Sequence, residues 1–350
     1  MEYKYKGKKV WSEQPHIADI YRIQYIHGIE SYIQRKNQEC REERRRFMSP
    51  EKLCKDQELY RELYKDMLGL HFEKEEKVPE TLITYVGQDE ICKIYRLSVY
   101  ITKEIPFYAM LLIPHGVEKC PLVIAQHGGY GTPELCSDMH GKNNYNHMVQ
   151  RILERKAAVL APQLLLWVTE ELETARAHPI PYDRRKIDSN LKRYGSSITA
   201  MEICGIQKSL DAVCELPEIL EDKIAMMGLS YGGYFTLYTM AADTRIKAGY
   251  TAGVFNDRDV YDWADFVYPF SALKFQDAEV AALCAPRKLY IQIGKEDKVF
   301  DYRSALPEIE KVRDYYQALE CTDNLKISIW EGGHTISMDE EGYDFLFSVF

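Results

Sequence analysis

One stretch, Gly-Leu-Ser-Tyr-Gly at residues 228–232, constrains the fold of this chain more than any other. The apolar run 225–229 before it is typical of a strand, and the residues after it have the pattern of a helix. A serine in a sharp strand-to-helix turn is lifted out at the strand tip, and the residues two before and two after it must be small. Gly228 and Gly232 meet that need, so we predict that Ser230 is a nucleophile. The alternative is an ordinary glycine-rich turn.

The rest of the chain predicts a sheet around this turn. The segments 83–86, 92–100 and 107–113 are typical of antiparallel strands separated by short polar links. Short apolar strands then alternate with helical segments, which predicts an α/β fold with a mostly parallel sheet and right-handed crossovers. The expected strands after residue 120 are 122–125, 158–161, 225–229, 246–252, 289–293 and 325–329, and the expected helices include 144–156 and 198–216.

Residues 1–78 form a charged, mainly helical extension that we expect to pack on a main domain, residues 79–350. Two stripes at helical spacing indicate helices there: Ile17, Ile20, Ile23 and Ile26, and then Leu59, Leu63 and Met67. Two insertions, near 163–197 and 255–275, interrupt the main domain after strand ends, where ligands bind in open α/β sheets. Their aromatic side chains, Trp167 and Trp263 among them, either wall a substrate pocket or only pack the loops down.

Composition excludes several classes of partner. A net charge of −9 over 350 residues disfavours nucleic acid or an anionic membrane as the main partner. Residues 1–9 are not followed by an apolar core, so we expect no signal peptide, and no apolar stretch reaches the roughly 20 residues that a membrane span needs. The nine cysteines are scattered without metal-ligand spacing, which fits reduced thiols in a cytoplasmic protein.

A serine nucleophile needs a base, and histidine has the pKa that suits this task. His334 follows the last expected strand and two glycines, which places it at the same sheet edge as Ser230. An acid that orients the base is expected after an earlier strand, and Asp297 has the spacing Gly294-x-x-Asp; its neighbours Glu296 and Asp301 are the alternatives. The order serine, aspartate, histidine differs from the orders in chymotrypsin and subtilisin.

An acyl transfer also needs donors for the developing oxyanion. One is the backbone N–H that follows the nucleophile, at Tyr231, and the other is expected from the loop after strand 122–125, at Gly129. His127 lies in this loop and precedes the nucleophile in the chain, and a structural role, bonding the loop backbone, is the better interpretation for it. The sequence contains neither a zinc-binding pattern nor a phosphate-binding loop, so we expect no metal and no cofactor.

Taken together, residues 80–350 resemble the α/β-hydrolase superfamily, and within it the branch of dienelactone hydrolases and acetyl xylan esterases. The resemblance is carried by His127-Gly128-Gly129, the turn at Ser230, Gly294-x-x-Asp297 and Gly333-His334. It implies the α/β-hydrolase fold, with helices on both faces of the sheet, and hydrolysis of carboxylic esters without a cofactor.

We therefore expect a serine esterase that uses Ser230, His334 and Asp297 as a triad and forms an acyl-enzyme, with Gly129 and Tyr231 as oxyanion donors. The expected substrate is an ester of a small molecule or a carbohydrate. One alternative is a serine peptidase of the prolyl oligopeptidase type, although residues 1–80 are too short and too helical for a β-propeller. The other is a binding protein without catalytic activity on a hydrolase scaffold, although such proteins normally lose the serine or the histidine.

Overall fold

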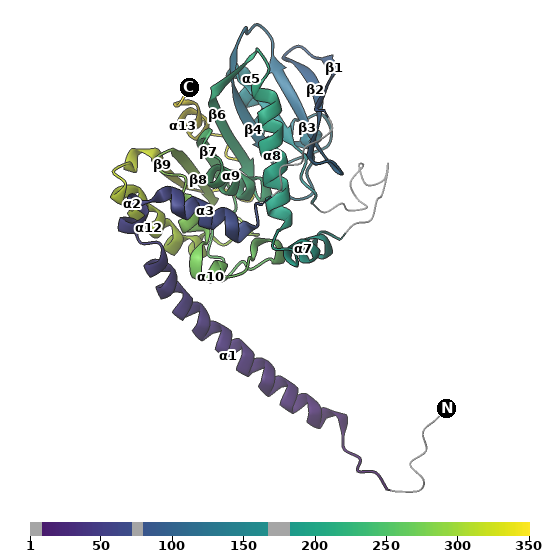
Figure 1. Cartoon of the computed structure of the whole chain (residues 1–350), viewed down its shortest axis with the longest axis vertical. Helices are drawn as coiled ribbons and strands as arrows, with labels where there is room; N and C mark the ends of the chain where they lie inside the picture. Colours follow the sequence, from purple (N-terminus) through teal and green to yellow (C-terminus); the bar gives the residue numbers. More distant parts are fainter. Residues whose placement is uncertain (1–8, 72–79, 167–182) are drawn as a thin grey trace.

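The computed structural model describes residues 9–71, 80–166 and 183–350, and its centre is a nine-stranded sheet (Figure 1). The strand order is β1-β2-β3-β5-β4-β6-β7-β8-β9. β1, β2, β3 and β5 pair antiparallel in turn, and every pair from β5 through β4 to β9 is parallel. The strands are β1 Leu82–Gln88, β2 Cys92–Thr102, β3 Ile105–Pro114, β4 Cys120–Gln126, β5 Ala158–Pro162, β6 Ile219–Leu229, β7 Ile246–Ala252, β8 Lys288–Gly294 and β9 Leu325–Trp330.

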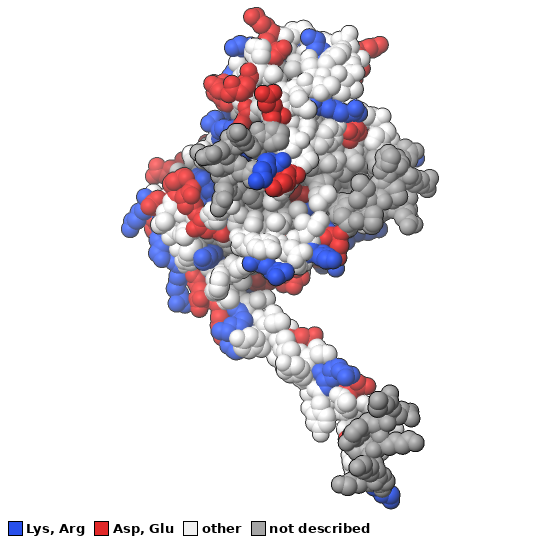
Figure 2. Space-filling model, turned by 45° about the vertical axis from the view of Figure 1, so that its right-hand side comes forward, with Lys and Arg blue, Asp and Glu red and all other residues white. Residues whose placement is uncertain are grey.

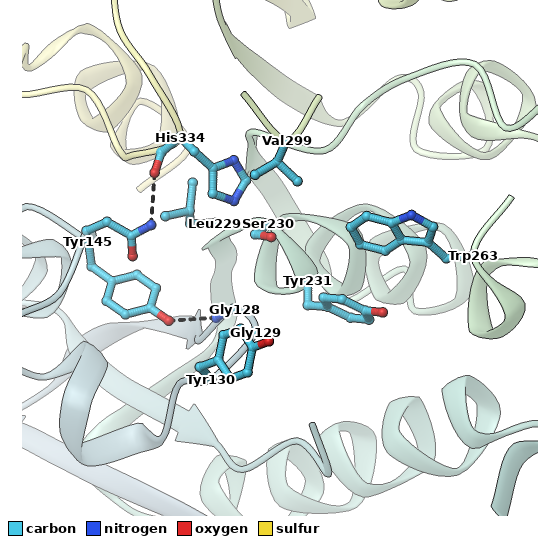
Figure 3. Close-up of a pocket in the computed structure, with 11 residues that line it drawn as sticks. Gly128, Gly129, Tyr130, Tyr145, Leu229, Ser230, Tyr231, Trp263, Val299 and His334 are labelled. Carbon is cyan, nitrogen blue, oxygen red and sulfur yellow. Dashed lines mark hydrogen bonds between the residues drawn. The ribbon is translucent and has the colours of Figure 1, made fainter. Parts of the chain in front are cut away.

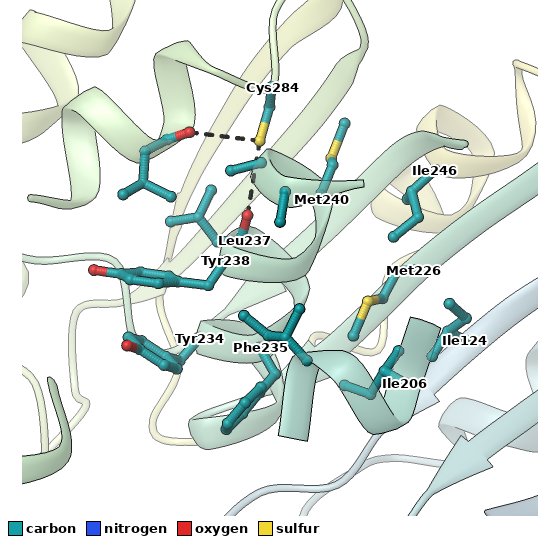
Figure 4. Packing of buried hydrophobic residues seen from close by; sticks show 14 of the residues in the cluster. Ile124, Ile206, Met226, Tyr234, Phe235, Leu237, Tyr238, Met240, Ile246 and Cys284 are labelled. Carbon is teal, nitrogen blue, oxygen red and sulfur yellow. Dashed lines mark hydrogen bonds between the residues drawn. The ribbon is translucent and has the colours of Figure 1, made fainter. Parts of the chain in front are cut away.

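The central strands are buried on both faces because successive side chains of a strand point to opposite sides of the sheet. In β4, Leu122 and Ile124 belong to the apolar cluster on one face, whereas Val123 and Ala125 belong to the cluster on the other. Figure 4 shows the first of these clusters, in which Ile124 and Met226 of adjacent strands lie on the side of α8 and α9. A continuous apolar run is therefore what a strand in this position requires.

Helices cover both faces. The larger cluster takes side chains from α3, α8, α9, α11 and α12, and the smaller one takes side chains from α5 and α13. All residues of α9 are buried, so the helix that follows Ser230 lies in the core. The helices of the main domain are α4 Pro133–Cys136, α5 Met148–Glu154, α7 Arg184–Lys192, α8 Ile198–Cys214, α9 Tyr231–Ala242, α10 Ser271–Lys274, α11 Asp277–Ala282, α12 Tyr302–Ala318 and α13 Glu341–Phe347.

The strands predicted from the sequence are all present, and the predicted α/β fold with a mostly parallel sheet is confirmed. The helix predicted over 144–156 is shorter, because α5 begins only at Met148. Asn146 and His147 have left-handed backbones, with φ of 51° and 58°, and cannot continue a right-handed helix. The segment before α5 is instead a loop that reaches the candidate site.

The N-terminal extension contains α1 Pro15–Phe47, α2 Pro50–Lys55 and α3 Gln57–Leu68. α2 and α3 pack on the main domain through buried Leu53, Tyr64 and Leu68. α1 differs from the expectation, because it projects away from the body of the molecule and contacts it only near its C-terminal end (Figure 1). An apolar stripe predicts a helix but does not specify which surface covers it.

All nine cysteines are unpaired, and six of them belong to the two apolar clusters of the core: Cys92, Cys120, Cys136, Cys204, Cys284 and Cys321. In the described ranges, no helix combines the length and the apolar character that crossing a membrane would require.

Candidate active site

Ser230 lies at the junction of β6 and α9 with φ of 59° and ψ of −122°. This conformation is strained for a residue with a side chain. The Ser230 N–H donates to the carbonyl oxygen of Ala252, at 2.8 Å, and so ties the turn to the end of β7. A Cβ on Gly232 would lie 2.0 Å from the carbonyl oxygen of Gln126, and one on Gly228 would lie 2.5 Å from the backbone of Gly232. The two glycines are therefore required by the close approach of backbone segments, as predicted.

His334 follows β9 and is hydrogen-bonded to Asp297, with 2.7 Å between His334 Nδ1 and Asp297 Oδ2. The other carboxylate oxygen of Asp297, Oδ1, accepts hydrogen bonds from the backbone N–H groups of Val299, at 2.7 Å, and Phe300, at 3.1 Å. Only 1% of the Asp297 side chain is exposed, against 20% of the His334 side chain. With Nδ1 as the donor to this carboxylate, Nε2 of the neutral ring is left as an acceptor.

The two other carboxylates considered from the sequence have different surroundings. Glu296 is exposed, and its backbone N–H donates to the carbonyl oxygen of Gly332 at 2.9 Å. Asp301 caps the N-terminus of α12 and forms an ion pair with Arg303. Neither is bonded to His334, so of these three carboxylates the described structure joins only Asp297 to the histidine.

The loop that carries His334 is held by residues that the sequence did not point to. Asn144 Nδ2 donates to the His334 carbonyl oxygen at 2.8 Å, and the Asn144 carbonyl oxygen accepts from the Thr335 hydroxyl at 2.6 Å. Gln292 of β8 donates to the Thr335 carbonyl oxygen at 2.8 Å. The ring of Phe300 lies against the imidazole with 5.9 Å between centroids. These contacts join positions far apart in the chain, and no local pattern identifies them.

The loop after β4 lies directly against the serine. A Cβ on Gly128 would be 2.8 Å from the Leu229 carbonyl oxygen and 3.3 Å from Ser230 Cβ. The Gly128 N–H donates to the hydroxyl of buried Tyr145 at 2.8 Å, so this amide has a partner within the protein. Gly129, the next residue, lines the cavity beside Ser230. Tyr231 begins α9, and the amides of a first helical turn point out of the helix.

His127 fixes this loop and is fully buried. Its Nε2 accepts from the backbone N–H of Leu164 at 2.9 Å, which requires the proton to be on Nδ1. Nδ1 then donates to the Gly128 carbonyl oxygen at 2.9 Å. Burial lowers the pKa of His127 to about 4, so the ring stays neutral at neutral pH. The neutral ring thus links the loop after β4 to the chain after β5.

A cavity of about 310 Å³ joins these groups at the carboxyl edge of the sheet (Figure 3). Its lining includes Ser230, His334, Gly129, Tyr231 and Trp263. Of the two insertion tryptophans, Trp263 lines this cavity, whereas Trp167 lies outside the described residues. Among the hydrogen bonds of the described residues, none joins the Ser230 hydroxyl to His334. In substrate-free sites such bonds are often long and tighten when substrate binds.

A buried ion-pair network behind the cavity joins the two insertions. Arg184 of α7 donates to Asp265 at 2.8 Å and makes a paired contact with Glu202 of α8 at 2.9 Å. The hydroxyl of Tyr231 donates to the second oxygen of Asp265 at 3.1 Å. Trp263 stacks on Tyr231 with 5.9 Å between ring centroids. The residue after the nucleophile is thus fixed by its own side chain as well as by α9.

Within residues 9–71, 80–166 and 183–350, no group of three or more His, Cys, Asp or Glu side chains is placed to hold a metal ion. The chemistry available at this cavity is that of a hydroxyl, an imidazole bonded to a carboxylate, and backbone amides.

No protein-family model matches this sequence, and no curated protein sequence matches it significantly. Solved structures do match. An acetyl xylan esterase candidate from Bacteroides fragilis is 16% identical with a TM-score of 0.66, over 85% of this chain and 83% of that one. The glucuronoyl esterase of Solibacter usitatus is 11% identical with a TM-score of 0.60, over 83% and 90% of the two chains. Acetyl xylan esterase 1 of Thermoanaerobacterium sp. is 14% identical with a TM-score of 0.57, over 84% and 94%. The chain therefore has the α/β-hydrolase fold.

The buried His127 predicts a specific pH dependence of stability. An unfolded histidine takes up a proton below its ordinary pKa of about 6.5, whereas folded His127 does so only near pH 4. Protonation therefore favours the unfolded state, and the free energy of unfolding is expected to fall by up to about 3 kcal/mol as pH drops through this window. Urea titrations of wild type and His127→Gln between these pH values measure the difference. A variant that loses stability as steeply as wild type would contradict the assignment.

Proposed function

We propose that this chain is a serine hydrolase that cleaves carboxylic esters of a small molecule or a carbohydrate. The observation that carries the proposal is the bond between His334 and buried Asp297, with the histidine and Ser230 lining one cavity. The neighbours in fold that are named as acetyl xylan and glucuronoyl esterases support the choice of esters.

In the proposed reaction the Ser230 hydroxyl attacks the acyl carbon while His334 Nε2 takes its proton. Asp297 accepts the Nδ1 hydrogen bond, which keeps the imidazole in the required tautomer and stabilises the cation that forms. The proton then passes to the leaving alcohol, and an acyl group remains on the serine. Water repeats the cycle, with His334 as the base, and releases the acid.

The proposed oxyanion donors are the backbone N–H groups of Gly129 and Tyr231. Support comes from their positions on either side of Ser230, one in the loop after β4 and the other at the start of α9. The amide of Gly128 is a poorer candidate because it already donates to Tyr145. An oxyanion donor of this kind contributes about 10²–10³ to turnover.

We also propose a cytoplasmic location and no nucleic-acid partner. The nine unpaired cysteines support the location, because secreted proteins more often pair their cysteines. The net charge of −9 supports the absence of a nucleic-acid partner.

Replacing the nucleophile tests the function directly. Ser230→Ala is expected to lose about 10⁶ in turnover on p-nitrophenyl esters while its thermal unfolding stays close to that of wild type. A fluorophosphonate probe should label wild type and leave the variant unlabelled. Residual turnover above about one per cent of wild type would reject Ser230 as the nucleophile. Peptide p-nitroanilides assayed beside the esters identify a peptidase if they are the better substrates.

The assignment of the acid is tested by three amide variants. Asp297→Asn is expected to lose about 10⁴ in turnover, because an amide in place of the carboxylate favours the wrong imidazole tautomer. Glu296→Gln and Asp301→Asn serve as matched controls and should stay within about tenfold of wild type, since the carboxylate hydrogen-bonded to His334 is that of Asp297. If Asp297→Asn keeps its activity while Glu296→Gln or Asp301→Asn loses it, the acid is the residue replaced in the inactive variant.

The cavity wall is tested at Trp263, which stacks on Tyr231 beside the nucleophile. Trp263→Ala enlarges the cavity, so the ratio of kcat/KM for long acyl chains to that for short ones should rise by about tenfold or more. The panel is p-nitrophenyl esters of increasing chain length, with the melting temperature measured in parallel. If the variant has a lower melting temperature but an unchanged chain-length preference, Trp263 only packs the insertion and does not select the substrate.

A further inference from the structure

The loop before α5 contacts the chain on both sides of the nucleophile (Figure 3). On one side, Asn144 Nδ2 donates to the carbonyl oxygen of His334 at 2.8 Å. On the other side, the hydroxyl of the next residue, Tyr145, accepts the Gly128 N–H at 2.8 Å. Two adjacent residues thus join the loop of the proposed base to the loop of the proposed oxyanion donor.

Tyr145 is itself held on both sides. Its side chain is buried, with 3% exposed, and its backbone N–H donates to Asn143 Oδ1 at 2.9 Å. Asn143 Nδ2 in turn donates to the carbonyl oxygen of Leu135 in α4 at 3.1 Å. Asn146, the residue after Tyr145, donates to the Thr335 hydroxyl at 3.1 Å. The phenol ring is packed in the interior, so its hydroxyl is an acceptor with a fixed position.

Tyr145 binds a stretch of backbone that has no side chains of its own to fix it. Gly128 and Gly129 are consecutive glycines, which adopt a wider range of backbone angles than any other residue. Their lack of side chains is required by the fold, because a Cβ on Gly128 would lie 2.8 Å from the Leu229 carbonyl oxygen. The orientation of these peptide units therefore depends on hydrogen bonds to the backbone.

The peptide unit between Gly128 and Gly129 is held at its carbonyl group. The Gly128 carbonyl oxygen accepts from His127 Nδ1 at 2.9 Å and from the Gly131 N–H at 3.1 Å. The peptide bond is trans, so the N–H of Gly129 points away from these two donors. Among the residues that the structure describes, this N–H has no acceptor, although Gly129 lines the cavity beside Ser230.

The preceding peptide unit, between His127 and Gly128, is held at its N–H group by Tyr145. With both units held, the φ and ψ angles of Gly128 are determined, and so is the direction of the Gly129 N–H. Gly128 is buried, and without the hydroxyl its N–H would lose its partner. A buried N–H without an acceptor is unfavourable, so the peptide unit would rotate toward another acceptor.

We propose that Tyr145 is a positioning residue of the active site, whose hydroxyl fixes the Gly128 amide and thereby directs the Gly129 N–H toward the oxyanion. Because Asn144 binds the loop of His334, the same segment sets the position of this donor relative to the base. The proposal rests on the proposed esterase function, and it assigns Tyr145 no contact with the substrate.

The kinetic test is Tyr145→Phe, which removes the hydroxyl and keeps the ring. With active sites counted by complete fluorophosphonate labelling, kcat on p-nitrophenyl esters should fall about 10- to 100-fold, while KM changes less than about threefold. Tyr316→Phe is the matched control, because it removes a buried hydroxyl that donates to the Arg287 carbonyl oxygen at 3.1 Å. Its kcat should stay within about twofold of wild type. Equal kcat values in the two variants overturn the proposal.

A trifluoromethyl ketone separates positioning from a loosened fold. The Ser230 oxygen adds to its carbonyl carbon, the hydroxyl proton passes to His334, and the ketone oxygen becomes the oxyanion of a hemiketal. In Tyr145→Phe the inhibition constant should rise by about the same factor as kcat/KM falls, because both depend on the oxyanion donors. A variant that is only less stable has fewer active molecules, and these bind the ketone as wild type does. A reduced kcat with an unchanged inhibition constant therefore overturns the proposal.

Hydrogen exchange of the Gly128 amide, followed by nuclear magnetic resonance, tests the contact without reference to catalysis. Tyr145→Phe should exchange this amide at least about tenfold faster than wild type, and Tyr316→Phe should leave the rate unchanged. Equal exchange in wild type and Tyr145→Phe rejects Tyr145 as the residue that holds this peptide unit. A wild type that hydrolyses no ester would reject the esterase function, and the exchange rates would still decide whether Tyr145 fixes the Gly128 amide.

Discussion

The close contact between the ends of two adjacent parallel strands determines the geometry of the site. β4 and β6 are neighbours, and the loop after one lies against the turn after the other with no room for side chains. A Cβ on Gly232 would overlap the Gln126 carbonyl oxygen, and one on Gly128 would crowd Ser230. Because interiors are packed at crystal-like density, these backbone contacts leave little freedom in the distance between the serine and the amide of Gly129. The remaining groups of the site are arranged around this fixed pair.

Local patterns in the sequence predicted the strands and the positions of Ser230, Asp297 and His334. Each of these residues comes at or shortly after the end of a strand, and parallel strands bring their carboxyl ends to one edge. The sequence therefore predicted which residues share that edge. It could not predict the groups that orient them, such as Asn144 behind His334 and Tyr145 behind Gly128, because hydrogen bonds between distant positions have no periodic signature.

The N-terminal extension shows a different limit. The isoleucine spacing correctly predicted a helix around residues 17–26, since periodicity shows which residues can share a face, and in the structure this helix spans Pro15–Phe47. Whether that face is covered by the same chain depends on where the helix begins and ends relative to the core. The Arg41 and Arg44 contacts fix only the C-terminal end of α1, so the helix continues past the edge of the main domain. The sequence pattern alone does not distinguish this exposed helix from α3, which the main domain covers through Tyr64 and Leu68.

Ion pairs connect the second insertion, residues 255–275, to α1, to α11 and to the first insertion. Arg41 of α1 binds Asp257 and Asp259 at its start, Arg258 is paired with buried Asp277 at 2.7 Å, and Arg184 binds Asp265 behind Trp263. The desolvation penalty of two buried ions is about as large as the free energy gained from their attraction, so such buried pairs add little to the free energy of unfolding. Their effect is on position, because a charge displaced from its partner would be left unpaired in the protein interior. The wall of the cavity beside Ser230 is therefore held from three directions, by α1, by α11 and by the first insertion.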